Sequence, residues 1–149
     1  MLTNGLISPK DSSGLFHNYA DNSSTFLDAS STALLASTVY RLSLLWGVHT
    51  YLPLAELSRK SLSTSNASGL LHFTADGWLT PVVDPYSYPD QGQDSPEGQA
   101  FIIAMQAAWG DWVADGSQGA NTSLRSVDLN VYVLVASFFV FNVMLWSGI

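Results

Sequence analysis

Three aromatic residues and one carboxylate fall in segments that are otherwise typical of loops. Trp78, Tyr86 and Tyr88 lie outside the apolar faces of the predicted helices, and Asp84 directly precedes Pro85. A ring with an apolar body and a polar tip suits stacking on a sugar, and a nearby carboxylate can accept hydrogen bonds from sugar hydroxyls. In the simpler interpretation the rings pack over a β-hairpin and Asp84 stabilises a turn. Both interpretations stay open at the level of sequence.

Other catalytic chemistries are not favoured by the residue types and their spacing. Many glycosidases use two carboxylates, but helix capping accounts for Asp94 and Glu97, and nothing singles out a pair. The chain has no Cys and no Gly-x-Ser-x-Gly segment, so a cysteine or serine nucleophile is not indicated. His17, His49 and His72 lack the spacing of a metal site. We therefore predict no catalytic residue, metal or cofactor from these patterns.

Charge and sequons limit the class of partner and the compartment. The 149 residues include five Lys and Arg against twelve Asp and Glu, for a net charge of −7. Nucleic acid is not expected as a partner, because nucleic-acid binding needs a basic patch and the cations here are scattered.

N-glycosylation sequons at Asn22, Asn66 and Asn121 favour the secretory pathway and an extracellular or cell-surface location. An unmodified surface loop is the alternative for each.

A helix is predicted between about 30 and 46. It follows a capping residue at Asp28, Ser30 or Ser31, and Gly47 is its stop. Because Ala and Val cover much of its other side, we expect it to be buried on most faces. The residues at helical spacing on one side are Leu34, Leu35, Thr38, Leu42 and Leu45, and those on the other side are Ala33, Ala36, Val39 and Tyr40.

A second helix is predicted over about 50–62, joined to the first by a short turn as an antiparallel pair. Its leucines are expected to face inward, and its charged residues Glu56, Arg59 and Lys60 to face solvent.

A third, largely buried helix is predicted to end near Ala114. Asp94 or Ser95 caps it, and Glu97 can complete a capping box with Asp94. Before it, a polar linker is expected over 63–69, a small β-hairpin between Leu70 and Val83, and a loop over 84–93.

The end of the chain differs from the rest in composition. The segment 131–149 is uncharged and apolar, and it follows small residues at 116–121 and a polar spacer at 122–130. This pattern is typical of a glycolipid-anchor signal, with a transmembrane helix or a buried helix as alternatives. We therefore predict a domain over 1–115, a linker over 116–130 and a hydrophobic helical tail over 131–149. Because residues 1–6 do not form a leader, we expect Met1 to be internal to a longer protein.

Two segments resemble glycoside hydrolase family 105, the six-hairpin glycosidases that act on unsaturated glucuronyl and rhamnogalacturonyl oligosaccharides. Residues 14–43 read GLFHNYADNSSTFLDASSTALLASTVYRLS and are similar to a late repeat of that family. Residues 76–112 read DGWLTPVVDPYSYPDQGQDSPEGQAFIIAMQAAWGDW and resemble its closing loop and final barrel helix. The resemblance implies a mainly α fold that is the C-terminal portion of an (α/α)₆ barrel, with a substrate cleft formed by loops at one end.

The same resemblance implies a function. The family hydrates the double bond of a terminal unsaturated uronic acid, so the expected partner is an oligosaccharide of the pectin type. His17 would lie beside the cleft, although a histidine hydrogen-bonded to backbone is the simpler interpretation. The family's catalytic aspartate belongs to a motif that this chain lacks, so no catalytic residue is carried over. A non-catalytic, membrane-anchored carbohydrate-binding or structural remnant is the alternative.

Overall fold

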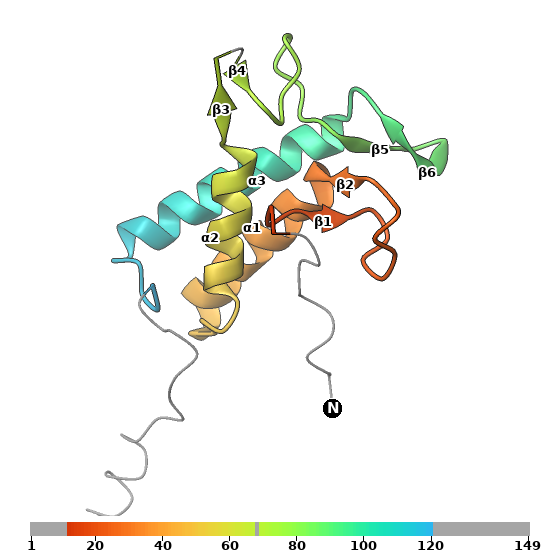
Figure 1. Cartoon of the computed structure of the whole chain (residues 1–149). Coiled ribbons are helices and arrows are strands. Elements are labelled where there is room, and N and C mark those ends of the chain that lie inside the picture. Colours follow the sequence, from red (N-terminus) through yellow and green to blue (C-terminus); the bar gives the residue numbers. More distant parts are fainter. Residues whose placement is uncertain (1–11, 68, 121–149) are drawn as a thin grey trace, which may run out of the picture.

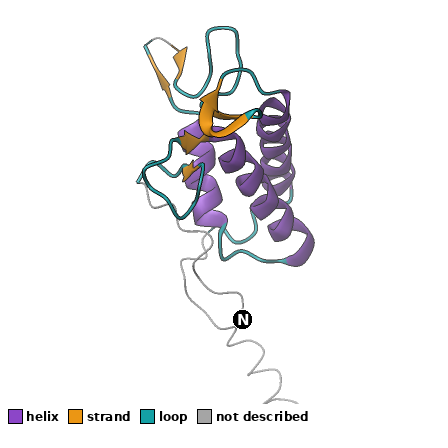
Figure 2. Ribbon diagram, turned by 90° about the vertical axis from the view of Figure 1, so that its right-hand side faces the viewer, coloured by secondary structure: helices purple, strands orange, loops and turns teal. Residues whose placement is uncertain are grey.

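A computed structural model of the chain describes residues 12–67 and 69–120. Within them, three helices pack side by side and short strands gather at one end of the helices (Figures 1 and 2). The predicted mainly helical fold is confirmed, whereas the predicted tail lies outside the described residues. The elements run in this order: β1 (Phe16–His17), β2 (Leu27–Asp28), α1 (Ala29–Trp46), α2 (Leu52–Leu62), β3 (Ser65–Asn66), β4 (Gly69–Leu70), β5 (Val82–Asp84), β6 (Ser87–Gly92) and α3 (Pro96–Ala114).

The core forms where α1 packs against both α3 and α2. Ala29, Ala33 and Ala36 are buried on α1, and their small side chains let the neighbouring backbone come close. Tyr40 of α1 and Met105 of α3 are completely buried and fill the space further along. The α1–α3 contact is thus built from small residues at one end and large ones beyond it.

The prediction that α1 is buried on most faces was wrong in part. Leu34, Leu42 and Leu45 are 42%, 37% and 73% exposed, while the face made of Ala and Tyr40 is buried. Which side of α1 is buried depends on how closely it packs against α2 and α3. The side with smaller residues packs more closely than the side with the leucines. Together with Trp46 and Ile103, these leucines form apolar surface that the three described helices leave uncovered.

The solvent-facing side predicted for α2 was also wrong in part. Glu56 and Arg59 have side chains only 24% and 16% exposed, because they turn toward α1 and α3. Leu57, which was expected to face inward, is 41% exposed. The buried residues of α2 are Leu52, Ala55, Ser58 and Leu62.

The helix ends follow local chemistry. Asp28 caps α1 as predicted: its carboxylate accepts hydrogen bonds from the backbone N–H groups of Ser30 at 3.0 Å and Ser31 at 3.1 Å. Gly47 ends α1 with φ +64°, also as predicted. The capping box expected from Asp94 does not form, because the Ser95 hydroxyl accepts the Gly98 N–H at 3.0 Å instead.

Three small antiparallel hairpins replace the strand pattern that was expected. The predicted hairpin between Leu70 and Val83 is reduced to one bridge between Phe73 and Leu79. The segment predicted as a linker holds β3 and β4, and the segment predicted as a loop holds β6, paired with β5. Polar residues such as Ser87 and Asp90 have low strand propensity, so contacts with the rest of the fold decide their conformation.

Candidate functional site

The loops and hairpins meet where α1 begins, α2 ends and α3 begins, and we call this region the loop end (Figure 1). Three hydrogen bonds between distant segments hold it together. The Ala29 N–H donates to the Pro81 carbonyl at 2.8 Å, and the Leu79 N–H donates to Gln99 Oε1 at 3.1 Å. The Asn18 side-chain amide donates to the Tyr88 carbonyl at 2.7 Å. The hairpin β1–β2 is therefore fastened to β6, and the 73–79 turn to α3.

His17 has a partner in its own hairpin. Its Nδ1 lies 2.7 Å from the carbonyl oxygen of Thr25, and the residue is half-buried. This is the simpler of the two arrangements expected for His17, and it fixes the ring against the loop between β1 and β2.

The tyrosines of the β5–β6 hairpin are the most accessible candidates. Tyr86 is 98% exposed and Tyr88 is 67% exposed. Asp84 Oδ1 accepts the Tyr86 N–H at 2.8 Å, which is the turn-stabilising role expected for an aspartate before proline. The two rings thus present open faces to solvent on a hairpin that Asp84 and Asn18 help to hold.

Trp78 occupies a different part of the loop end. It is half-buried in the 73–79 turn, where its backbone N–H donates to Thr74 Oγ1 at 3.0 Å. No hydrogen bond or ring contact among the described residues joins Trp78 to Tyr86 or Tyr88. The structure therefore brings His17, Asp84 and the tyrosines into one region and does not place Trp78 in contact with them.

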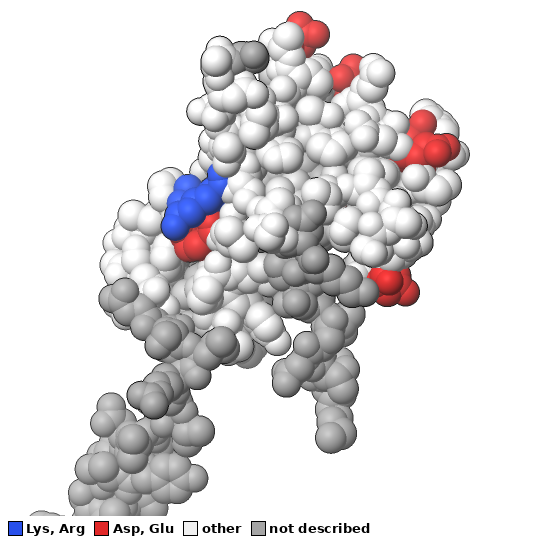
Figure 3. Space-filling view, in the orientation of Figure 1, with Lys and Arg blue, Asp and Glu red and all other residues white. Residues whose placement is uncertain are grey.

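A buried polar cluster on the helices was missed by sequence reasoning. The Tyr40 hydroxyl donates to Glu56 Oε1 at 2.5 Å, and Arg59 donates to both oxygens of Glu56 at 3.1 and 3.2 Å. The Arg59 guanidinium also lies 4.3 Å from the centre of the Trp109 ring. Lys60 Nζ lies 3.9 Å from Glu56 Oε2. Figure 3 shows one patch of Lys and Arg beside an acidic group on this face, with other acidic groups toward the loop end. The cluster joins α1, α2 and α3.

Electrostatics within this cluster favour a structural role. Burial raises the pKa of Tyr40, and the hydrogen bond to the Glu56 carboxylate raises it further. Burial alone would raise the pKa of Glu56, but hydrogen bonds from Arg59 and Tyr40 and the nearby positive charges hold it below its usual value. The hydrogen bond to Glu56 raises the pKa of Arg59. All three groups keep their ordinary protonation states near neutral pH, so none is poised to transfer a proton.

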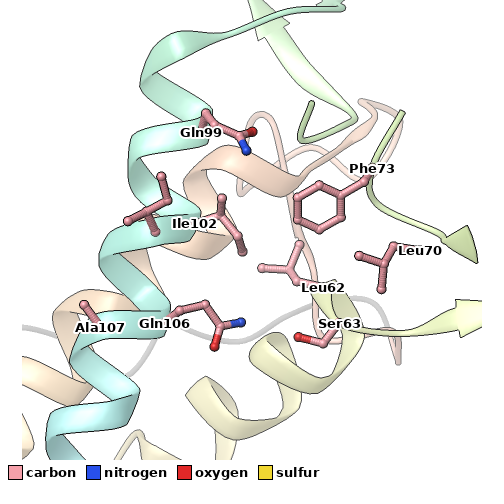
Figure 4. Close-up of a pocket in the computed structure, with 9 residues that line it drawn as sticks. Leu62, Ser63, Leu70, Phe73, Gln99, Ile102, Gln106 and Ala107 are labelled. Atoms are coloured by element: carbon pink, nitrogen blue, oxygen red, sulfur yellow. The ribbon is translucent and has the colours of Figure 1, made fainter. Parts of the chain in front are cut away.

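An apolar hollow of about 520 Å³ lies between the end of α2, residues 70–73 and the first half of α3 (Figure 4). Its polar neighbours include Gln99, which is occupied by its hydrogen bonds to the 73–79 turn. An apolar lining suits an aliphatic or aromatic group better than a hydroxyl-rich sugar. The apolar residues at its wall are Leu62, Leu70, Phe73, Ile102 and Ile103.

Comparisons with known proteins agree with this architecture. No family model matches the sequence, and no curated protein matches it. A solved structure that matches is described as a possible member of the GH105 family from Salmonella enterica serovar Paratyphi A. The two chains superpose with a TM-score of 0.55 and 24% sequence identity, over 68% of this chain and 27% of the other. The chain thus spans about a quarter of the length of the structure that it matches.

At this level of identity the superposition indicates the fold. The predicted resemblance to glycoside hydrolase family 105 is thereby confirmed as a likeness in fold: the chain folds like one part of a possible family 105 protein.

Proposed function

We propose that this chain is part of a glycoside hydrolase that acts on unsaturated uronyl oligosaccharides of the pectin type. The observation that carries the proposal is the fold shared with a possible GH105 protein. The proposal assigns the substrate class by resemblance and assigns no catalytic residue to this chain.

Within the proposal, the β5–β6 hairpin contributes to the substrate surface. Tyr88 and Tyr86 offer exposed rings for stacking against a sugar, and Asp84 fixes the turn that carries them. Asn18 acts as a positioning residue, because its side-chain amide connects β1–β2 to the backbone of Tyr88. His17 contributes by bonding to the Thr25 carbonyl, within the loop between β1 and β2.

Within this proposal, activity is expected only when the chain is joined to a family 105 segment that carries a catalytic aspartate. The measurement is loss of the absorbance of the unsaturated uronyl group in a disaccharide, with this chain and an N-terminally extended protein compared side by side. Hydration by the extended protein alone supports the proposal. Activity with neither protein favours the non-catalytic remnant, and activity of this chain alone would show that a catalytic residue was overlooked.

Replacing Tyr88 by Ala in the extended protein is expected to lower kcat/KM by roughly 2- to 10-fold, mainly through a higher KM. Losing one aromatic contact removes about 0.5–1.5 kcal/mol, and 1.4 kcal/mol corresponds to a factor of ten. The matched control is Trp46→Ala, because Trp46 is 77% exposed but lies at the other end of α1. Equal effects of the two substitutions would contradict a substrate role for Tyr88.

We also propose that the segment 131–149 addresses the protein to a membrane in the secretory pathway. The support is the uncharged, apolar composition of this segment. The segment itself lies outside the described residues. No helix in the described part of the chain has the length and apolar character needed to cross a bilayer. With a leader added, truncation after Asn130 is expected to abolish membrane association. Release by a glycolipid-specific phospholipase indicates an anchor, whereas association that survives truncation contradicts the proposal.

A further inference from the structure

The loop between β1 and β2 places an asparagine and a serine of one sequon in direct contact. Asn22 Oδ1 accepts the Ser24 backbone N–H at 3.0 Å and the Ser24 hydroxyl at 2.7 Å. This is an Asx turn, in which the side chain of one residue closes a ring with the backbone two positions later. The carboxamide of Asn22 and the hydroxyl of Ser24 therefore lie on the same side of the turn.

The turn is closed by neighbouring residues alone. The Asn22 N–H donates to the Tyr19 carbonyl at 2.8 Å, and the Asn22 carbonyl accepts from the Thr25 hydroxyl at 2.8 Å. Because every partner lies within three residues, the arrangement does not require the helices to be packed, and a nascent chain can form it.

The side-chain nitrogen of Asn22, Nδ2, donates no hydrogen bond to any residue in the described part of the chain. Both side-chain hydrogen bonds of Asn22 use Oδ1, and residues 21–24 are all exposed. A group attached to Nδ2 would therefore extend into solvent without breaking a contact of the fold. Hydrogen bonds to Oδ1 also draw electron density from the amide, which makes an Nδ2 proton easier to remove.

We infer that Asn22 is an acceptor for an N-linked glycan. In this reaction a bond forms between Asn22 Nδ2 and C1 of an oligosaccharide carried on a polyprenyl diphosphate, and the bond from C1 to the diphosphate oxygen breaks. The diphosphate leaves with the electron pair, and a base of the transferase takes the Nδ2 proton. This inference depends on the sequon and its turn, and not on the sugar chemistry proposed for the loop end.

The sequon that begins at Asn66 supplies a matched control. Asn66 belongs to β3 and is paired with Gly69 of β4, so its backbone is committed to a hairpin ladder. An Asn66→Gln variant removes that sequon while leaving the Asn22 turn unchanged.

The test is expression of the full chain behind a secretory leader in eukaryotic cells, followed by peptide mapping. Enzymatic release of the glycan converts the modified asparagine to aspartate, so the modified position can be identified by mass. We expect the modification at Asn22, its complete loss in Asn22→Gln and Ser24→Ala, and its retention in Ser24→Thr and Asn66→Gln. An unmodified Asn22 in the secreted chain, or the same Asn22 signal in Ser24→Ala, overturns the inference.

Discussion

Replacing Tyr40 by Ala is expected to lower the free energy of unfolding by about 3–5 kcal/mol, the range for truncating a large buried aromatic residue. Tyr40 is completely buried in α1, and its ring centre lies 5.5 Å from that of Trp112 in α3. Truncation would leave a cavity between the helices. It would also remove the hydrogen bond that the Tyr40 hydroxyl donates to Glu56. Urea denaturation followed by circular dichroism measures the change.

The conservative variant Tyr40→Phe separates the two contributions. It keeps the ring and removes the hydroxyl, so we expect a loss of roughly 1–2 kcal/mol, typical of a hydrogen bond to a charged group that retains other partners. Glu56 still has its ion pair with Arg59 in this variant. If Tyr40→Ala proves no more destabilising than Tyr40→Phe, the ring does not hold the α1–α3 contact.

The second large effect is expected at Gly14, where Gly14→Ala should destabilise the fold by roughly 2–5 kcal/mol. The residue is buried with φ +82°, a backbone conformation that costs an L-residue about 1–2 kcal/mol. A Cβ there would lie 2.5 Å from Leu57 Cγ and 3.2 Å from the Leu57 carbonyl carbon. Relieving such a clash costs about 1–3 kcal/mol more. The Gly14 carbonyl also accepts the Ser58 hydroxyl at 2.7 Å, so movement of this segment disturbs α2.

Gly77→Ala is the matched control for Gly14→Ala. Gly77 has φ +86°, but a Cβ there would meet no atom within 4 Å. Only the backbone cost of about 1–2 kcal/mol is expected. The difference in stability between the two variants therefore measures how tightly the segment around Gly14 packs on α2. Equal losses of stability, measured by thermal and urea unfolding, would mean that the segment around Gly14 does not pack tightly against Leu57.

Local chemistry explains why the helices and their ends could be predicted from sequence. The cap at Asp28 and the stop at Gly47 involve residues only two to five positions away, so the residue types specify the outcome. The sequence resemblance likewise agrees with the observed fold, because a possible GH105 structure superposes on 68% of the chain. The exposed position of Tyr86 and Tyr88 also follows from their placement in a segment rich in Pro, Asp and Ser.

Contacts between distant segments decided what the sequence could not. The buried face of α1 depends on the shapes of α2 and α3, so the side with the alanines is buried and the leucines at 34, 42 and 45 are exposed. The Asn18–Tyr88 bond joins residues 70 positions apart, and the Tyr40–Glu56 bond spans 16. No periodicity or cap signals such partners. The sequence by itself therefore determined the helices and the fold family that they resemble, whereas the tertiary structure determined which side chains meet, because those meetings depend on how the helices and hairpins pack in space.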